Sequence, residues 1–272
     1  MPPFTPIANI KAIVSNCYYD YHKPGNPACV LRDVVPILWF GDMDAYFASE
    51  KKIVTVAVNP SKLEFQDDKG ISSIRYRFPG APANYVLHNP QHFVAYKNAM
   101  DGYFKNNPYV KWFWHNEKVL RLFDASYQGM LCSYKNDSGE AFTNTALHID
   151  LKAPAATDPV WGKLHLNDRN AIEIIYAKYF DFMWRYLDPD ILVVSTSAQN
   201  VKETFGINHG NAVIHQTSKG GYVDLHIIYS PVSGKRVNIV WGLNRNTPFS
   251  GSGMTCEFIR ESCCAIRQEI NF

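Results

Sequence analysis

The chain lacks any large excess of charge, since its formal net charge is only +2 over 272 residues. A value this small does not by itself indicate a nucleic-acid-binding protein, although it leaves room for a local basic patch. Long apolar runs are also missing, and no stretch approaches the ~20 residues needed to span a bilayer. The N-terminus has three early prolines and no basic segment followed by an apolar one, so it does not resemble a secretory signal. We therefore expect a cytoplasmic protein with no membrane segment.

Cysteine is scarce and irregularly spaced. The six cysteines are Cys17, Cys29, Cys132, Cys256, Cys263 and Cys264. No pair has the Cys-x-x-Cys spacing of a zinc ribbon or a thioredoxin motif, and we expect neither a metal nor a cofactor. Cys263 and Cys264 fall in a helical pattern, and we interpret both as small buried apolar side chains.

Three nucleotide-binding and hydrolase motifs are absent as well. The sequence contains no Gly-x-Ser-x-Gly, no Walker loop and no Gly-x-Gly-x-x-Gly. Their absence argues against a small-molecule α/β hydrolase or transferase without excluding one. We also find no internal repeat and no low-complexity segment.

Short apolar segments alternate with helical ones along the chain. Strands are predicted at 34–40, 53–58, 145–151, 191–194, 212–215, 223–229 and 236–241, and helices at 91–106, 109–123, 168–187, 198–205 and 257–269. This order predicts a three-layer α/β/α fold with a central, mostly parallel four-stranded sheet and additional antiparallel strands. We expect a single domain over 1–272, with 1–33 forming an irregular N-terminal arm.

The most informative segment is the predicted strand Ile53–Val58, which ends at Asn59-Pro60-Ser61. Proline cannot extend a central strand, because it lacks the N–H that the ladder needs. Asn59 is therefore placed at the carboxyl end of a buried strand, where α/β proteins bind ligands. The simpler alternative is an Asx-Pro turn in which Asn59 hydrogen-bonds nearby backbone.

Polar loops follow two further predicted strands. They are Asp150-Leu151-Lys152 and Gly242 to Ser250, which contains Asn244, Arg245 and Asn246. In a parallel sheet all three strand ends would meet at one edge, although polar loops at that edge are common in α/β proteins.

These segments together resemble the uracil-DNA glycosylase superfamily, and most closely its mismatch-specific and single-strand-selective branches. Ala57-Val58-Asn59-Pro60-Ser61 is similar to the Gly-x-Asn-Pro-Gly that ends the first strand in those branches. His148 to Pro154, Leu192 to Ala198 and Asn246-Thr247-Pro248-Phe249-Ser250 occupy the places of the later motifs. The resemblance covers roughly residues 36–270, by order of elements and short, partly matched motifs.

The resemblance implies hydrolysis of the N-glycosidic bond of a flipped-out damaged or mismatched base, uracil or a related one, with DNA as partner. Asn59 would position the attacking water, and Asn246, with Asn244 or Arg245, would donate hydrogen bonds to the departing base. Phe65 or Phe78 would stack on the base, and Lys219 would contact a phosphate unless it lies in a plain hairpin turn. The remaining substrate-binding positions are Pro60, Ser61, Asp150 and Ser250.

The sequence departs from the family pattern at three places. Ser61 replaces a glycine, Asp150 stands where several branches have asparagine, and the last motif has no histidine. An ionised aspartate only accepts hydrogen bonds, so the base differs from uracil, Asp150 is protonated, or Asp150 points elsewhere. The cysteine spacing excludes the iron–sulfur branch.

Three functions therefore stay open. The first is a DNA glycosylase-like enzyme of base-excision repair. The second is a non-catalytic relative that binds nucleic acid or a nucleotide, and the third is a small-molecule α/β hydrolase. The sequence does not fix the oligomeric state, and we favour a monomer.

Overall fold

The computed structural model describes residues 9–67, 69–70, 73–86, 89–129, 141–208, 213–216, 221–243 and 255–270. The chain divides into two compact units. The first comprises residues 1–41, 58–108 and 149–187, and the second comprises residues 42–57, 109–148 and 188–272. The expectation of a single domain over 1–272 stays a prediction.

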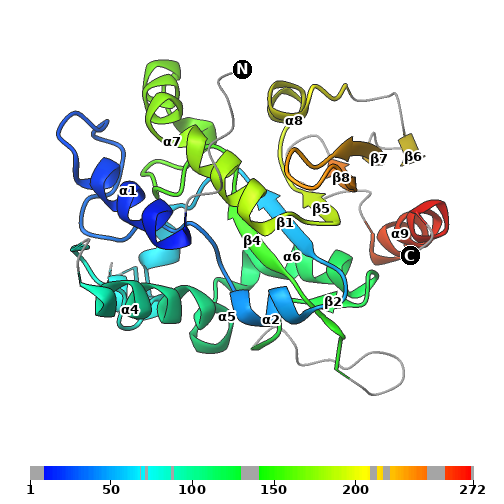
Figure 1. Ribbon diagram of the computed structural model, residues 1–272. Coiled ribbons are helices and arrows are strands. Elements are labelled where there is room, and N and C mark those ends of the chain that lie inside the picture. The colour runs from blue at the N-terminus through cyan, green and yellow to red at the C-terminus, as the bar shows by residue number, and fades with distance from the viewer. Residues whose placement is uncertain are drawn as a thin grey trace. The chain divides into compact units, whose positions relative to one another are not determined.

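The sheet contains six strands in the order β4-β1-β5-β8-β7-β6 (Figure 1). The strands are β1 (Ile53–Ala57), β4 (Leu147–Asp150), β5 (Ile191–Val194), β6 (Val213–Gln216), β7 (Tyr222–Tyr229) and β8 (Arg236–Leu243). The pairs β1–β5 and β5–β8 are parallel, whereas β8–β7 and β7–β6 are antiparallel. The protein is thus a three-layer α/β/α fold around a mostly parallel sheet, as the sequence predicts.

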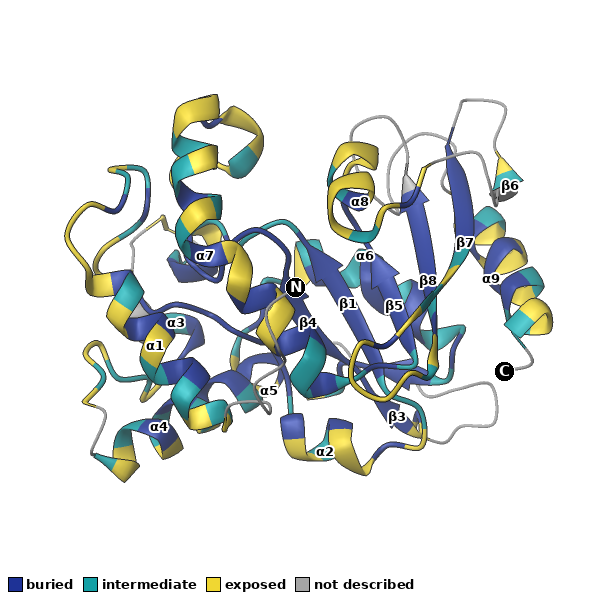
Figure 2. Ribbon diagram, turned by 45° about the horizontal axis from the view of Figure 1, so that its top comes forward, coloured by how far each residue is buried: buried dark blue, intermediate teal, exposed yellow. Residues whose placement is uncertain are grey.

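Burial follows the position of each strand in the sheet. Every residue of β1 and β5 is buried, which explains their unbroken apolar sequences (Figure 2). In β7 the first four residues are buried, and exposed residues alternate with partly buried ones in the second half. That change matches a strand near the sheet edge with one face in solvent.

The second unit also holds α2 (Met43–Ala48), α6 (Val110–Arg121), α8 (Ala198–Phe205), α9 (Cys256–Ile270), and a two-stranded pair of β2 (Ala125–Ser126) and β3 (Asn144–Thr145). The helix α6 packs against β5 and α9, and α9 packs against β6 and β7.

Of the two adjacent cysteines in α9, Cys263 is buried but Cys264 is exposed. Our expectation that both are buried is wrong for Cys264, because neighbouring helical positions point about 100° apart.

The first unit contains α1 (Ile10–His22), α3 (Ile74–Arg77), α4 (Pro90–Asp101), α5 (Tyr103–Asn106), α7 (Leu166–Leu187) and the short 3₁₀ helices η1 (Lys62–Phe65) and η3 (Trp161–Lys163). The expected irregular arm over 1–33 is wrong for α1. Asn9 caps this helix by accepting a hydrogen bond from the Lys11 N–H at 3.0 Å. One face of α1 is buried, and the helix packs against α7.

The predicted strand over 34–40 is also wrong. This segment is buried, but the structure assigns it no strand beyond a single bridge residue, Phe40. Its backbone is satisfied from elsewhere, because the Ile37 N–H donates to Pro154 O at 2.8 Å and the Leu38 N–H donates to Tyr96 Oη at 3.0 Å. The apolar run over 34–40 therefore indicated burial correctly, but it did not indicate that these residues pair with another strand.

Candidate functional site

The segments that follow β1 and β4 lie side by side. The Lys152 N–H donates to Val58 O at 2.8 Å, and the Thr157 N–H donates to Pro60 O at 3.3 Å. Ser61 and Thr157 form a parallel bridge. Two of the three strand-end loops singled out in the sequence thus meet at one place, within the first unit. We call this group of residues 58–64 and 150–158 the strand-end site.

Asn59 is half-buried in the strand-end site, and its side-chain nitrogen is fully engaged. Nδ2 donates to Pro60 O at 2.8 Å, to Thr157 Oγ1 at 3.1 Å and more weakly to Ala155 O at 3.4 Å. These contacts include bonds to nearby backbone, as the simpler alternative expects, but they are made by the side-chain nitrogen and not by the oxygen that accepts in an Asx turn, and they orient the amide. Oδ1 receives no hydrogen bond from the residues that the structure describes, so its lone pairs are available to a water or ligand.

Asp150 and Lys152 bring charge to the same corner. Asp150 is the last residue of β4 and is 8% exposed, and Lys152 is 5% exposed. The Lys152 Nζ lies 2.9 Å from Glu173 Oε2, which neutralises the lysine from the α7 side. Buried charges are costly without partners, so this pair explains how Lys152 is tolerated.

Glu64 is a buried carboxyl three residues after Ser61, in η1. It is 5% exposed, and its N–H donates to Ser61 O at 3.1 Å. The Tyr103 hydroxyl donates to Glu64 Oε2. Burial raises the pKa of the Glu64 carboxyl to about 7; the Tyr103 hydrogen bond and the nearby Arg77 guanidinium lower it, and the Asp150 carboxylate raises it. Glu64 is thus a weak acid poised near neutrality, within electrostatic range of Asp150.

The two phenylalanines expected to stack on a base lie elsewhere in the packing. Phe65 and Phe78 are both fully buried, with ring centroids 5.4 Å apart. Phe78 also stacks on Tyr103 at 5.2 Å, and Tyr103 meets Phe40 edge-on at 4.8 Å. In this arrangement neither phenylalanine presents a face to a ligand, and both rings instead pack behind the hydroxyl that contacts Glu64.

The other predicted site residues fall outside the described part of the chain. They are Asn244, Arg245, Asn246, Ser250 and Lys219. The strand-end site therefore brings together Asn59, Pro60, Ser61 and Asp150 of the predicted set.

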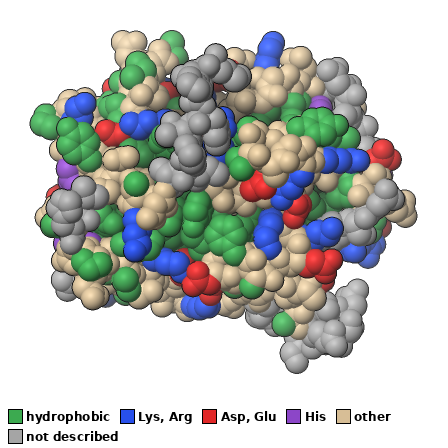
Figure 3. Space-filling view, in the orientation of Figure 1, with side chains coloured by type: hydrophobic (Ala, Val, Ile, Leu, Met, Phe, Trp, Pro, Cys, Tyr) green, Lys and Arg blue, Asp and Glu red, His purple; other side chains and the backbone are tan. Residues whose placement is uncertain are grey.

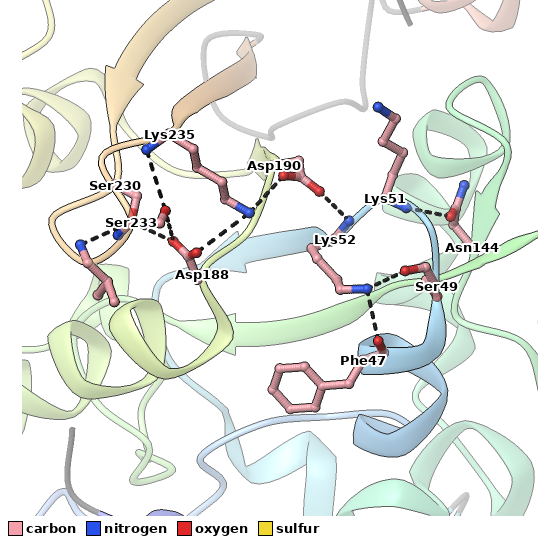
Figure 4. A network of polar contacts seen from close by, with 11 residues as sticks. Phe47, Ser49, Lys51, Lys52, Asn144, Asp188, Asp190, Ser230, Ser233 and Lys235 are labelled. Atoms are coloured by element: carbon pink, nitrogen blue, oxygen red, sulfur yellow. Dashed lines mark hydrogen bonds and ion pairs between the residues drawn. The ribbon is translucent and has the colours of Figure 1, made fainter. Parts of the chain in front are cut away.

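A network of hydrogen bonds and ion pairs lies at the amino ends of β1 and β5. Asp190 Oδ2 accepts the Lys52 N–H at 2.8 Å, and its Oδ1 accepts Lys235 Nζ at 2.7 Å (Figure 4). Asp188 accepts hydrogen bonds from Ser230 and Ser233, and the Lys52 ammonium donates to the backbone oxygens of Phe47 and Ser49. These charges pair with one another and with backbone, as expected of a structural network.

Charges of both signs are intermixed on the face shown in Figure 3, where Lys and Arg lie beside Asp and Glu. Among the described residues no cluster of His, Cys, Asp and Glu is suited to hold a metal ion. None of the described helices has the length and apolar character required to cross a bilayer.

Comparison with protein-family models, with curated proteins and with solved structures finds no match for this chain.

Sequence reasoning missed two residues of the strand-end site, Glu64 and Thr157. Glu64 stands between Leu63 and Phe65 directly after the Asn-Pro-Ser segment. An acidic residue between two apolar ones in an otherwise polar loop was the available signal for a buried carboxyl. Thr157 carries no comparable signal, because only the pairing of two distant loops places its hydroxyl against Asn59.

Proposed function

We propose that this chain is a DNA glycosylase-like enzyme that hydrolyses the N-glycosidic bond of a flipped-out damaged or mismatched base. The observation that supports the proposal is the side-chain amide of Asn59. Its nitrogen donates to Pro60 and Thr157, and its oxygen, at the carboxyl end of a parallel strand, accepts no hydrogen bond within the described part of the chain.

The chemistry fits an amide that orients without accepting a proton. A water that donates to Asn59 Oδ1 has its own oxygen directed at the bound sugar. As that oxygen bonds to C1′, the C1′–N bond breaks and its electron pair stays on the base; the attacking water gives up one proton to solvent, and the departing base takes one up from solvent. Holding the water in line lowers the barrier by positioning, which an amide does without changing its protonation state.

The test is release of free base from oligonucleotides that contain uracil, hypoxanthine or related lesions, in single and double strands. We expect release from at least one substrate, and Asn59→Ala lowers the single-turnover rate about 100-fold, because the water loses its orientation. Asn89→Ala is the matched control. Asn89 caps α4 by accepting the Gln91 N–H at 3.0 Å, away from the strand-end site.

Both variants are first compared with the wild type by circular dichroism and thermal unfolding, so that lost activity is not confused with lost fold. Salt-dependent DNA binding without base release would instead support the non-catalytic relative. Absence of release across the whole panel would overturn the proposal.

A further inference from the structure

A cavity of about 320 Å³ lies between the carboxyl end of α1 and the middle of α7, within the first unit. The two helices pack against each other and lie side by side in Figure 1. The cavity shares no residue with the strand-end site, and its volume is within the range of small-molecule sites. Its lining includes the polar residues Asp20, Lys23, Asn26 and Lys178 and the apolar residues Ile174 and Ile175.

Two tyrosines of α7 hold the polar wall of this cavity in place. The Tyr179 hydroxyl donates to Asp20 Oδ2 at 2.7 Å, and the Lys178 ammonium lies 2.5 Å from the same oxygen. The Tyr176 hydroxyl donates to Asn26 Oδ1 at 2.8 Å, and Asn26 Nδ2 donates to the backbone oxygen of Asp20 at 2.8 Å. The carboxylate and the turn after α1 are therefore fixed before a ligand arrives, which lowers the entropic cost of binding.

Two groups of opposite charge in the lining keep bonding capacity. Both contacts of the Asp20 carboxylate use Oδ2, and Oδ1 accepts no hydrogen bond from the residues that the structure describes. The Lys23 side chain is exposed, and its ammonium makes no ion pair or hydrogen bond within the described part of the chain. The cavity thus offers an acceptor to a cationic group and a donor to an anionic one.

The α7 side of the cavity adds an apolar surface. Ile174 is 85% exposed, and its neighbour Ile175 is partly exposed. Covering these side chains with an apolar group removes them from water, which is favourable. Gly25, in the turn after α1, has no heavy atom within 4 Å of the place where a side chain would begin, so the space beside it is open.

We propose that this cavity binds a free α-amino acid with an apolar side chain. The ligand ammonium donates to Asp20 Oδ1, the ligand carboxylate pairs with Lys23, and the ligand side chain covers Ile174. A ligand with a single charge fits less well, because a cation meets the two lysines of the lining and an anion meets Asp20. This inference does not depend on the proposed glycosylase function.

The experiment titrates the wild-type protein with three probes that share one apolar chain and follows the heat of binding. The probes are L-leucine, isocaproate, which lacks the ammonium, and isoamylamine, which lacks the carboxylate. We expect leucine to bind with a dissociation constant of about 1 mM or tighter. Isocaproate and isoamylamine bind at least about tenfold more weakly, because each leaves one charged group of the cavity without its partner.

Two variants test the assigned contacts, and a third is the control. Lys23→Gln weakens leucine binding about tenfold and leaves isoamylamine binding unchanged. Asp20→Asn weakens leucine binding and leaves isocaproate binding no weaker than in the wild type, and its fold is first checked by circular dichroism, since Asp20 also holds Tyr179 and Lys178. Lys163→Gln changes an exposed lysine of η3 outside the lining and keeps the wild-type affinity.

Three results would each overturn the amino-acid site. They are no saturable leucine binding at about ten times the expected dissociation constant, isocaproate or isoamylamine binding as tightly as leucine, and unchanged leucine affinity in Lys23→Gln. Base release from oligonucleotides is measured separately, so the glycosylase proposal stands or falls on its own experiment.

Discussion

Glu64 is placed where water cannot fully solvate its charge, and this has a consequence for stability as well as for chemistry. An unfolded chain ionises this residue near pH 4.5, whereas the folded protein ionises it near pH 7. Between these values the folded state binds more protons than the unfolded state. The contribution of Glu64 is therefore favourable in acid and is lost as the pH rises through about 7.

We accordingly expect Glu64 to lower the free energy of unfolding by up to roughly 3 kcal/mol as the pH rises from 4.5 to 7. In Glu64→Gln this contribution is absent. The difference in stability between variant and wild type should thus shift in favour of the variant over this range. Urea unfolding at a series of pH values measures it, and a difference that does not change with pH would show that Glu64 is ionised normally.

For Asn59, the two interpretations offered by the sequence are compatible with each other. The sequence offered a turn-forming amide or a ligand-binding amide as alternatives. In the structure the nitrogen donates to backbone and to Thr157, and the oxygen accepts no hydrogen bond from the residues that the structure describes. The two roles use different atoms, so the contacts of the nitrogen are what orient the oxygen.

At the scale of elements, the continuous apolar strands were predictable and the first 40 residues were not. β1, β5, α7 and α8 lie within a few residues of their predicted ranges. Each has a strong local pattern, and Gly206 at the end of α8 adopts a φ of +70°, as expected of a helix-terminating glycine. α1 and the segment 34–40 lack such signals, because their conformation depends on partners distant in sequence.

The network at the amino ends of β1 and β5 predicts a measurable effect of one carboxylate. Asp190→Ala removes the acceptor of the Lys52 N–H and of the Lys235 ammonium. We expect a loss of about 2 kcal/mol in the free energy of unfolding, since a backbone donor loses its acceptor and the Lys235 ammonium keeps only the longer contact with Asp188, at 3.7 Å.

Asp181→Ala is the comparison for Asp190→Ala. Asp181 pairs with Arg185 on the surface of α7, with its side chain 52% exposed. An exposed helical pair of this kind contributes about 0.5 kcal/mol or less. Equal losses in the two variants, measured by urea unfolding, would show that the Asp190 network adds nothing beyond a surface ion pair.

At the scale of the whole molecule, the small net charge bears on how a nucleic acid would be held. The net charge is +2, and charges of both signs are intermixed on the face in Figure 3. If the protein binds DNA as proposed, this mixture of signs and the small net charge favour few phosphate contacts on that face.

We therefore expect the affinity for single-stranded DNA to fall gently with salt. The slope of log affinity against log salt concentration should be about −3 or shallower, as for about four phosphate contacts. Fluorescence anisotropy across a salt series measures this slope. A much steeper dependence would reveal an extended basic surface, contrary to this expectation.

The sequence by itself determined the class of fold, because buried parallel strands require unbroken apolar runs and these alternate with amphipathic helices. It also placed Asn59 and Asp150 at strand ends. Only the tertiary structure decided which loops meet, since the contact of Asn59 with Thr157 spans 98 residues. It also buried Phe65 and Phe78 in the core and gave Glu64 its neutral-range acidity, because burial and through-space charge are properties of packing and not of local sequence.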